Sequence, residues 1–340
     1  MKTEKLNVVY ACNNNYAPYA CVSICSLLMN NQTFSAIDVY VVLEDVAEEN
    51  RQKLQRQAER FGANFIPVDP KIMIQEMKKL KLPQYRGSHA ANCRIFFERF
   101  IREDVERLLY LDCDTIVTGD VRPLLQSDMG EACACVVQDA LTCDYKKLVG
   151  FRDGEPYFNS GVILIDVENW RKFDCTSRII EHLKTVRSDY CNPDQDVLNI
   201  LLKGRVRFAG PENNYQPIHR LLNDKSYLRI YSDSNYYSEE ELVYAKNHPV
   251  IYHSYRFLGE FPWHRDSWHP DRELFDYYLS KSCQSDFIKP TAPKSLIIAV
   301  EKILYIILPR PYFFRLHKLI QDSSFQKRNQ QLQRNMRDRK

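Results

Sequence analysis

The sequence predicts an α/β protein built on a mostly parallel β-sheet with helices on both faces. Through the first half of the chain, short apolar runs typical of buried strands alternate with segments whose apolar residues recur at helical spacing. The composition is that of a folded protein, with 44% hydrophobic and 27% charged residues. At 340 residues, the chain is long enough for one large domain or two modest ones.

The expected elements of the first half follow one another as strand and helix. We expect strands at residues 6–11, 37–43, 64–69 and 107–112, and helices at 16–31, 47–62 and 94–102. In a sheet of this kind, ligands bind at the carboxyl ends of the strands. Asn13 and Asp112 each follow such an end, so the two are expected to share one crevice.

The middle of the chain is less regular but contains no linker. Strands are expected at residues 132–139 and 161–167, and one helix at 167–186. A second helix is expected at 192–204, with Pro193 and Asp194 in its first turn and Gly204 as its C-terminal cap. Residues 1–282 are therefore predicted to form one domain.

Residues 283–340 are predicted to form a helical extension, apolar first and basic afterwards. The apolar segment 295–308 contains Glu301 and Lys302, and its 14 residues would span about 21 Å as a helix, less than the ~30 Å hydrocarbon core of a bilayer. It is too short to cross a membrane. Aliphatic and aromatic residues followed by Lys and Arg favour binding to an anionic membrane surface; the alternative is a helix that packs on the domain.

The charge is divided unevenly along the chain. The net charge is +3, and the last 32 residues hold nine Lys or Arg against two Asp, so this tail carries +7 and the first 308 residues carry −4. No nucleic-acid partner is expected. The 11 Cys are odd in number and form no CxxC pair, and the N-terminus lacks the apolar region of a signal peptide. These features predict free thiols and a cytoplasmic protein.

The segment "LLYLDCDTIVTGDV" at residues 108–121 raises a chemical question, because two carboxylates directly follow a buried strand. Asp112 and Asp114 lie at i and i+2 of an extended segment, so their side chains point the same way. Two convergent carboxylates are hard oxygen ligands that suit Mg²⁺ or Mn²⁺. From the spacing alone, a solvated turn is the favoured explanation of the pair. No glycine-rich phosphate loop is present as another nucleotide site.

Five stretches in one order carry a family resemblance. They are "VVYACNNNYAPYACVSICSL", "NCRIFFERFI" with "ERLLYLDCDTIV", "YFNSGVILIDVENWR", "PDQDVLNILLKG" and "HSYRFLGEFPWHR". With them, residues 7–265 resemble the retaining glycosyltransferases of family eight, which include lipopolysaccharide galactosyl- and glucosyltransferases and, more distantly, glycogenin. The resemblance implies the GT-A fold, a Rossmann-like α/β sheet, and a catalytic domain at residues 1–282.

The resemblance also implies a metal site. It makes His253, which follows the apolar run "PVIY", the third ligand beside Asp112 and Asp114. An imidazole ligand favours Mn²⁺, with Mg²⁺ as the alternative. Without the family, His253 reads as a hydrogen-bonded residue at the end of a strand.

The donor implied by the family is a uridine diphosphate (UDP) sugar. Residues of the first turn would hold uracil and ribose, with Tyr16 stacked on the base, although "NNNY" is also a good helix cap. Arg94 would contact the donor and Asn159 the donor sugar, while an exposed helix face and a plain turn are the alternatives. The full donor-binding set is Ala11, Asn13, Asn15, Tyr16, Arg94, Asp112, Cys113, Asp114, Asn159, Gln195, His253, Arg256 and Gly259.

The reaction centre is expected in "PDQD". Asp194 would bind sugar hydroxyls, Gln195 would lie beneath the anomeric carbon, and Asp196 sits beside it. A carboxamide is a weak nucleophile, so we expect a front-face reaction in which the acceptor hydroxyl attacks from the side that the diphosphate leaves. Acids in a first helical turn are also common for electrostatic reasons.

Two departures from the family pattern stand out. Many relatives have Asp where this chain has Asn13. The family's last motif carries a diphosphate-binding Lys, but here the motif is two residues longer and Phe261 precedes Pro262 and Trp263. Arg256 or Arg265 is expected to replace the Lys, and Arg256 is favoured because it lies between His253 and Gly259.

The expected function is transfer of galactose or glucose, with retention, from UDP-galactose or UDP-glucose to a glycan or glycolipid acceptor of the cell envelope, at the inner face of the plasma membrane. The missing Lys motivates an alternative, a catalytically weak homologue that binds sugar nucleotide or acts as a scaffold. A nucleotidyltransferase would also use paired Asp, but it needs a Gly- and Lys-rich loop that "ACNNNY" does not provide.

Overall fold

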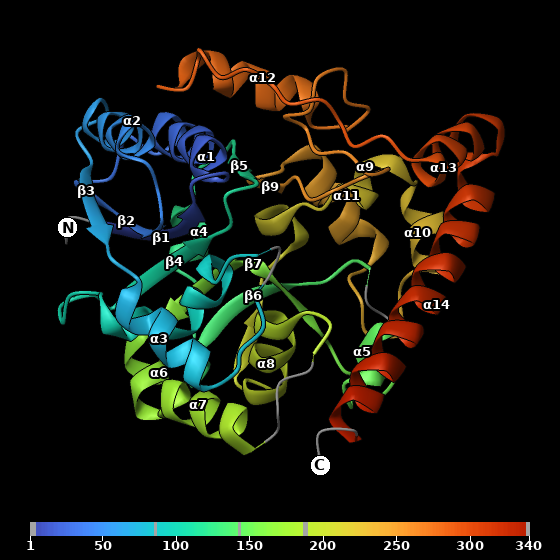
Figure 1. The fold of residues 1–340 in the computed structure, drawn as a ribbon, viewed down its shortest axis with the longest axis horizontal. Helices are drawn as coiled ribbons and strands as arrows, with labels where there is room; N and C mark the ends of the chain where they lie inside the picture. Colours follow the sequence, from blue (N-terminus) through green and yellow to red (C-terminus); the bar gives the residue numbers. More distant parts are fainter. Residues whose placement is uncertain (1–4, 85–86, 142–143, 186–189, 338–340) are drawn as a thin grey trace.

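The computed structural model describes residues 5–84, 87–141, 144–185 and 190–337. Its centre is a seven-stranded sheet in the order β3-β2-β1-β4-β7-β6-β8 (Figure 1). The strands are β1 (Lys5–Asn13), β2 (Ala36–Glu44), β3 (Asn64–Val68), β4 (Arg107–Leu111), β6 (Ala134–Gln138), β7 (Phe158–Asp166) and β8 (Val206–Phe208). Only β7 runs against its neighbours β4 and β6, and every other adjacent pair is parallel. The predicted fold class is confirmed.

Both faces of the sheet are buried. Along β1, Val8 and Tyr10 belong to one apolar cluster while Val9 and Ala11 belong to another, as alternating side chains require. The first cluster is completed by α1 (Ala17–Asn30), α2 (Glu48–Glu59) and α12 (Arg272–Lys281). The second is completed by α3 (Lys71–Lys79), the 3₁₀ helix η1 (Ala90–Arg99), α6 (Val167–Lys172), α7 (Cys175–Thr185) and α8 (Pro193–Leu201).

A small antiparallel ribbon lies at the edge of this core. It pairs β5 (Thr115–Val117) with β9 (Ile251–His253), two segments far apart in the chain. The segment between β8 and β9 forms η2 (Pro211–Asn214), α9 (Ile218–Leu221), α10 (Asp224–Ile230) and α11 (Glu239–Asn247). Two short helices, α4 (Arg122–Leu125) and α5 (Tyr145–Leu148), follow β5 and β6 in the chain.

Two expected helices differ from the structure. The helix expected at residues 94–102 is the 3₁₀ helix η1, which starts earlier and is kinked at Phe96. The single helix expected at 167–186 is two helices, α6 and α7, because the chain turns at Asp174, whose φ is +53°. Asp tolerates this left-handed conformation better than most residues do. Residue 186 lies outside the described part of the chain.

The C-terminal extension forms two helices, α13 (Leu296–Ile307) and α14 (Arg310–Arg337), which run along one side of the molecule (Figure 1). α14 contacts α10 and α5 and buries Phe313 and Phe314, whereas α13 buries no residue. In the described ranges, no helix combines the length and apolarity needed to cross a membrane. The ten cysteines of these ranges are free thiols.

Candidate active site

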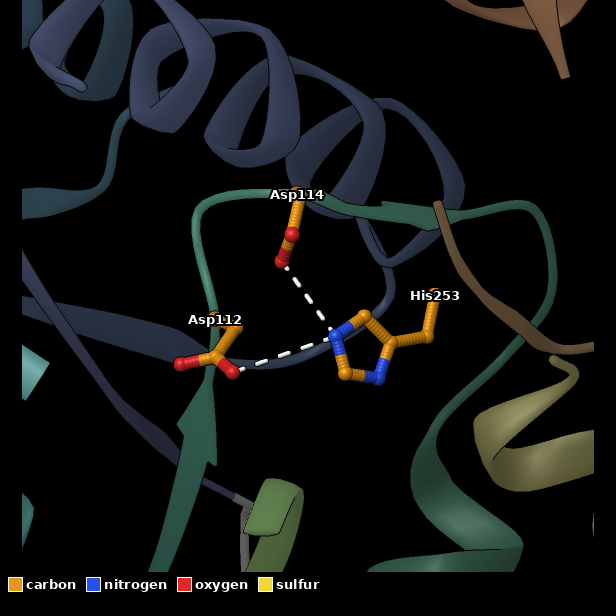
Figure 2. A group of neighbouring side chains, drawn as sticks. All are labelled: Asp112, Asp114 and His253. Atoms are coloured by element: carbon orange, nitrogen blue, oxygen red, sulfur yellow. Dashed lines mark ion pairs between the residues drawn. The ribbon is translucent and has the colours of Figure 1, made fainter. Parts of the chain in front are cut away.

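Asp112, Asp114 and His253 converge, as the sequence predicted. One possible ligand atom of each lies within 4.8 Å of the other two. Both carboxylates approach the same imidazole nitrogen, with Nε2 of His253 at 3.3 Å from Asp114 Oδ1 and 3.8 Å from Asp112 Oδ2 (Figure 2). Two carboxylate oxygens and one imidazole nitrogen form a donor set that suits Mn²⁺.

Backbone pairing brings these three residues together. Asp112 directly follows β4, and its N–H donates to the carbonyl of Gly161 at 2.8 Å, which extends the pairing with β7. Asp114 directly precedes β5, in which Thr115 pairs with His253 of β9, and its carbonyl accepts from the N–H of Ser254 at 2.7 Å. The ribbon therefore sets the imidazole beside the carboxylates.

The His253 ring is oriented from two sides. Its Nδ1 lies 3.1 Å from Asn214 Oδ1, and Asn214 Nδ2 donates to Asn159 Oδ1 at 3.0 Å, so the amide oxygen of Asn214 faces the ring. Nδ1 then carries the proton and Nε2 is left to bind a metal. On the other side, a Cβ at Gly161 would lie 2.1 Å from His253 Cε1. Only glycine leaves room for the ring in this position.

Arg94 links the Asp112–Asp114–His253 group to Asp194 at the start of α8. Its buried guanidinium donates to Asp112 Oδ1 at 2.8 Å and forms an ion pair with Asp194 Oδ2 at 3.2 Å. Burial would lower the pKa of Arg94, but Asp112, Tyr110 and Asp194 raise it above its ordinary value. Burial raises the pKa of Asp112 although Arg94 opposes this. For His253, burial lowers the pKa, but attraction to Asp114 and Asp112 outweighs burial and the net pKa is raised. The two carboxylates thus concentrate negative charge beside the imidazole, which a cation would neutralise.

Gln195 lies in a network of hydrogen bonds at the start of α8. Its Oε1 accepts from the N–H of Ser160 at 3.0 Å, and its Nε2 donates to Asp139 Oδ2 at 3.2 Å. Asn159 donates to the same Asp139 oxygen at 3.0 Å. Since β7 runs opposite to β4 and β6, its first residues lie at the edge where those strands end. Residues at the starts of β7 and α8 and directly after β4 and β6 therefore meet at one edge of the sheet.

These side chains line a cavity of about 580 Å³. Twelve of the residues expected from the sequence are among its lining: Ala11, Asn13, Tyr16, Arg94, Asp112, Cys113, Asp114, Asn159, Asp194, Gln195, His253 and Arg256. Asn13 also accepts from the N–H of Tyr16 at 3.1 Å, which closes the turn before α1; the N-cap of α1 is Tyr16 without a side-chain cap, so the expected helix cap is not formed. Phe261, at the position of the missing Lys, lines the cavity and stacks on Trp263 with ring centroids 4.4 Å apart.

Three expected site residues are not part of the cavity lining. Asn15 is exposed in the turn. Gly259 has a φ of +77°, and a Cβ there would lie 2.5 Å from Ile298 of α13. Asp196 is fully buried and accepts from the hydroxyls of Tyr145 and Tyr157. Its position supports the turn that carries Gln195, and burial raises its pKa to about 6.

The sequence interpretation missed several residues of the site. Asp139 directly follows β6, so it carries the same strand-end signal as Asp112 and could have been found. Asn214 and Gly161 contact His253 from distant parts of the sequence, so no local sequence pattern indicates their role. Gln321 and Phe325 of α14 also line the cavity, although nothing in the basic tail sequence points to it.

Known proteins are similar to this chain in sequence and in fold. A lipopolysaccharide 1,2-glucosyltransferase of Escherichia coli is 28% identical over 313 residues, which cover 91% of this chain and 88% of that protein. General stress protein A of Bacillus subtilis is 26% identical and covers 82% and 94% of the two chains. The crystal structure of galactosyltransferase LgtC with donor and acceptor sugar analogues matches 82% of this chain and 96% of that one, with a TM-score of 0.65 and 26% identity. The family model of glycosyl transferase family 8 matches residues 7–266. The chain belongs to glycosyl transferase family 8.

Proposed function

We propose that this chain is a metal-dependent, retaining hexosyltransferase that moves galactose or glucose from its UDP derivative to a cell-envelope acceptor such as lipopolysaccharide or capsule. The convergence of Asp112, Asp114 and His253 at the edge of the cavity is the observation that carries the proposal. The E. coli relative and the LgtC structure support a hexose and an envelope glycan.

The residues present fit a divalent cation. Asp112 Oδ2, Asp114 Oδ1 and His253 Nε2 would hold it, because Arg94 occupies the other oxygen of Asp112 and Asn214 faces the other nitrogen of His253. Such a cation supplies neutralisation of the diphosphate charge when the donor is bound. We propose Mn²⁺ for this site, with Mg²⁺ as the alternative.

The protein's own groups position the donor and the reacting carbon. Asp194 and Asn159 are placed to bind hydroxyls of the donor sugar, and Gln195 presents its amide from a turn fixed by Ser160 and Asp139. The Gln195 amide is already held at both ends and is a weak nucleophile. A front-face reaction therefore fits better than a covalent intermediate, with the leaving phosphate oxygen accepting the proton of the acceptor hydroxyl.

We propose Arg256 as the cation that replaces the family's diphosphate Lys. Arg256 lines the cavity, whereas Arg265 does not and its N–H donates to the carbonyl of Pro290. After Arg256 the chain turns sharply, with φ of +46° at Leu258 and +77° at Gly259. The charge is thereby supplied from a different position in the loop.

Hydrolysis of a panel of UDP-sugars tests the proposal. UDP should be released from UDP-galactose or UDP-glucose with Mn²⁺ present, and the release should stop when the metal is chelated. Asp114→Asn should lower the rate by at least about 100-fold with the fold intact, and Asp120→Asn, a surface change, should not. If UDP binds but no sugar is released from any donor, the catalytically weak homologue is the correct interpretation.

A further inference from the structure

Helix α14 forms one wall of the active-site cavity. Gln321 and Phe325, one helical turn apart, line it together with Gln195 and Arg256. The ring of Phe325 packs on Tyr145 with centroids 4.5 Å apart, and the Tyr145 hydroxyl donates to Asp196. The extension is thereby connected to the turn that carries the reaction centre.

Two buried polar atoms of the cavity lining have no hydrogen-bond partner among the described residues. They are Gln321 Oε1 and Tyr255 Oη, and both side chains line the cavity. Buried polar atoms normally have partners because leaving them unpaired is unfavourable. A saccharide supplies hydroxyl groups for both atoms.

An apolar trough of about 510 Å³ lies between α13 and α14 and meets the cavity at the same two side chains. Gln321 and Phe325 line both spaces. The other lining residues are mostly aliphatic or aromatic, and they are Leu296, Ile297, Val300, Glu301, Leu304, Phe313, Leu316, His317, Ile320 and Ser324. Glu301 and His317 pair with each other, with Oε1 3.6 Å from Nε2, and the other polar residues of the wall are Gln321 and Ser324.

We propose that the acceptor is an amphipathic glycolipid whose saccharide occupies the cavity at Gln321, Phe325 and Tyr255 while its alkyl chain lies in the trough. This inference rests on the proposed function and narrows its acceptor class. The two side chains that line both the trough and the cavity favour one molecule that occupies both spaces over a bilayer that merely covers the helices.

Two matched variants on α14 separate the trough from general surface hydrophobicity. Ile320 lines the trough and is 61% exposed, and its neighbour Leu319 is 68% exposed but lines neither space. Ile320→Asp places a charge against the alkyl chain, whereas Leu319→Asp makes the same chemical change outside the trough. Thermal unfolding of both variants checks that the fold is kept.

The binding probes are n-dodecyl β-maltoside below its micelle concentration and maltose, titrated by calorimetry into the full chain with UDP and Mn²⁺. We expect the dodecyl compound to bind wild type at least about tenfold more tightly than maltose, since burial of the chain adds affinity. Ile320→Asp should remove this preference and Leu319→Asp should keep it. Absence of the preference in wild type, or an equal loss in both variants, would overturn the inference.

Donor hydrolysis by wild type separates this inference from the proposed function. Hydrolysis without a preference for the dodecyl compound would sink only the glycolipid inference. A preference that depends on Ile320, without hydrolysis of any UDP-sugar, would sink only the proposed catalytic activity.

Discussion

At the scale of single residues, Gly161 determines where the His253 ring can lie. A Cβ at this position would meet the imidazole at 2.1 Å. We therefore expect Gly161→Ala to displace the ring and weaken Mn²⁺ binding by about 10- to 100-fold, the range found when groups that orient a metal ligand are disturbed. Calorimetric titration of Mn²⁺ measures this effect.

Gly119→Ala is the matched control for that substitution. A Cβ at Gly119 would contact Val250 at an ordinary 3.4 Å, away from the ligands. Mn²⁺ affinity should be unchanged in this variant. Wild-type affinity in Gly161→Ala would mean that the imidazole does not bind the metal in the orientation seen here.

Asp196 makes stability depend on pH. Its pKa is raised by burial from 3.8 to about 6, so the folded protein holds a proton that the unfolded chain releases near pH 4. The contribution of Asp196 to the free energy of unfolding is therefore fully present below about pH 4 and is lost as the pH rises through about 6. The loss amounts to about 3 kcal/mol. Asp196→Asn should remove that part of the pH dependence.

Urea unfolding at pH 4.5 and 7.5 measures the difference between wild type and Asp196→Asn at each pH. The variant should gain stability relative to wild type at the higher pH. Asp120→Asn, a half-exposed surface change, should track wild type at both. Parallel behaviour of Asp196→Asn and wild type would show that the carboxylate is ionised in the folded protein throughout.

The sequence predicted the residues of the site that follow strand ends or lie in family motifs. Asp112, Asp114, Gln195 and His253 are of this kind, and the structure gathers them. Asn214 could not be found in this way, because its role arises from a contact across 39 residues of chain. Asp196 belongs to the motif "PDQD", but it does not line the cavity, because it is enclosed by two tyrosines whose hydroxyls donate to it.

At the scale of elements, α14 is anchored near its start by aromatic packing. Phe314 is 1% exposed and packs in a cluster with Tyr231, whose hydroxyl donates to the Phe314 carbonyl at 3.1 Å. We expect Phe314→Ala to destabilise this helix by about 3–5 kcal/mol. Hydrogen exchange of the α14 amides measures the local loss.

Tyr312 provides the control on the same helix. It is 62% exposed, so Tyr312→Ala should change the free energy of opening of α14, measured by hydrogen exchange, by no more than about 0.5 kcal/mol. Equal exchange in Phe314→Ala and wild type would mean that α14 does not rest on the domain in solution.

Packing on the domain is seen for both helices of the extension, since Leu304 and Tyr305 of α13 and Phe313 and Phe314 of α14 join one apolar cluster, and membrane binding stays a prediction. Phe313 and Phe314 of α14 pack on the domain, while α13 leaves Leu296, Ile297 and Ile306 exposed. The sequence predicted the apolar helix at 295–308 and a helical extension, but it predicted neither the division into α13 and α14 nor which faces pack on the domain. The prediction of one continuous helix at 167–186 was wrong for a related reason, because no local signal in the sequence marks the left-handed residue Asp174.

At the scale of the whole molecule, charge and apolar exposure coincide on the extension. The last 32 residues carry +7 while the rest carries −4, and α13 presents its aliphatic side chains beside them. We propose peripheral attachment to an anionic membrane at its cytoplasmic face. Sedimentation with phosphatidylglycerol vesicles should exceed that with phosphatidylcholine vesicles and should weaken as salt rises.

The composition of the vesicles provides the control for membrane attachment. Equal sedimentation with both kinds of vesicle, insensitive to salt, would remove the electrostatic part of the proposal. The division into a catalytic domain at 1–282 and an extension at 283–340 stays a prediction. The segment after 282 returns to the domain, where the N–H of Cys283 donates to Gln57 at 2.8 Å.

The pairing of β5 with β9 has a consequence for the order of events during synthesis. The ribosome has delivered Asp112 and Asp114 long before His253, which follows Asp114 by 139 residues (253 minus 114). Until residue 253 has been synthesised, the two acids lack the imidazole. The group proposed to hold the metal is therefore completed late in synthesis, and a chain that terminates before residue 253 lacks one of its three side chains.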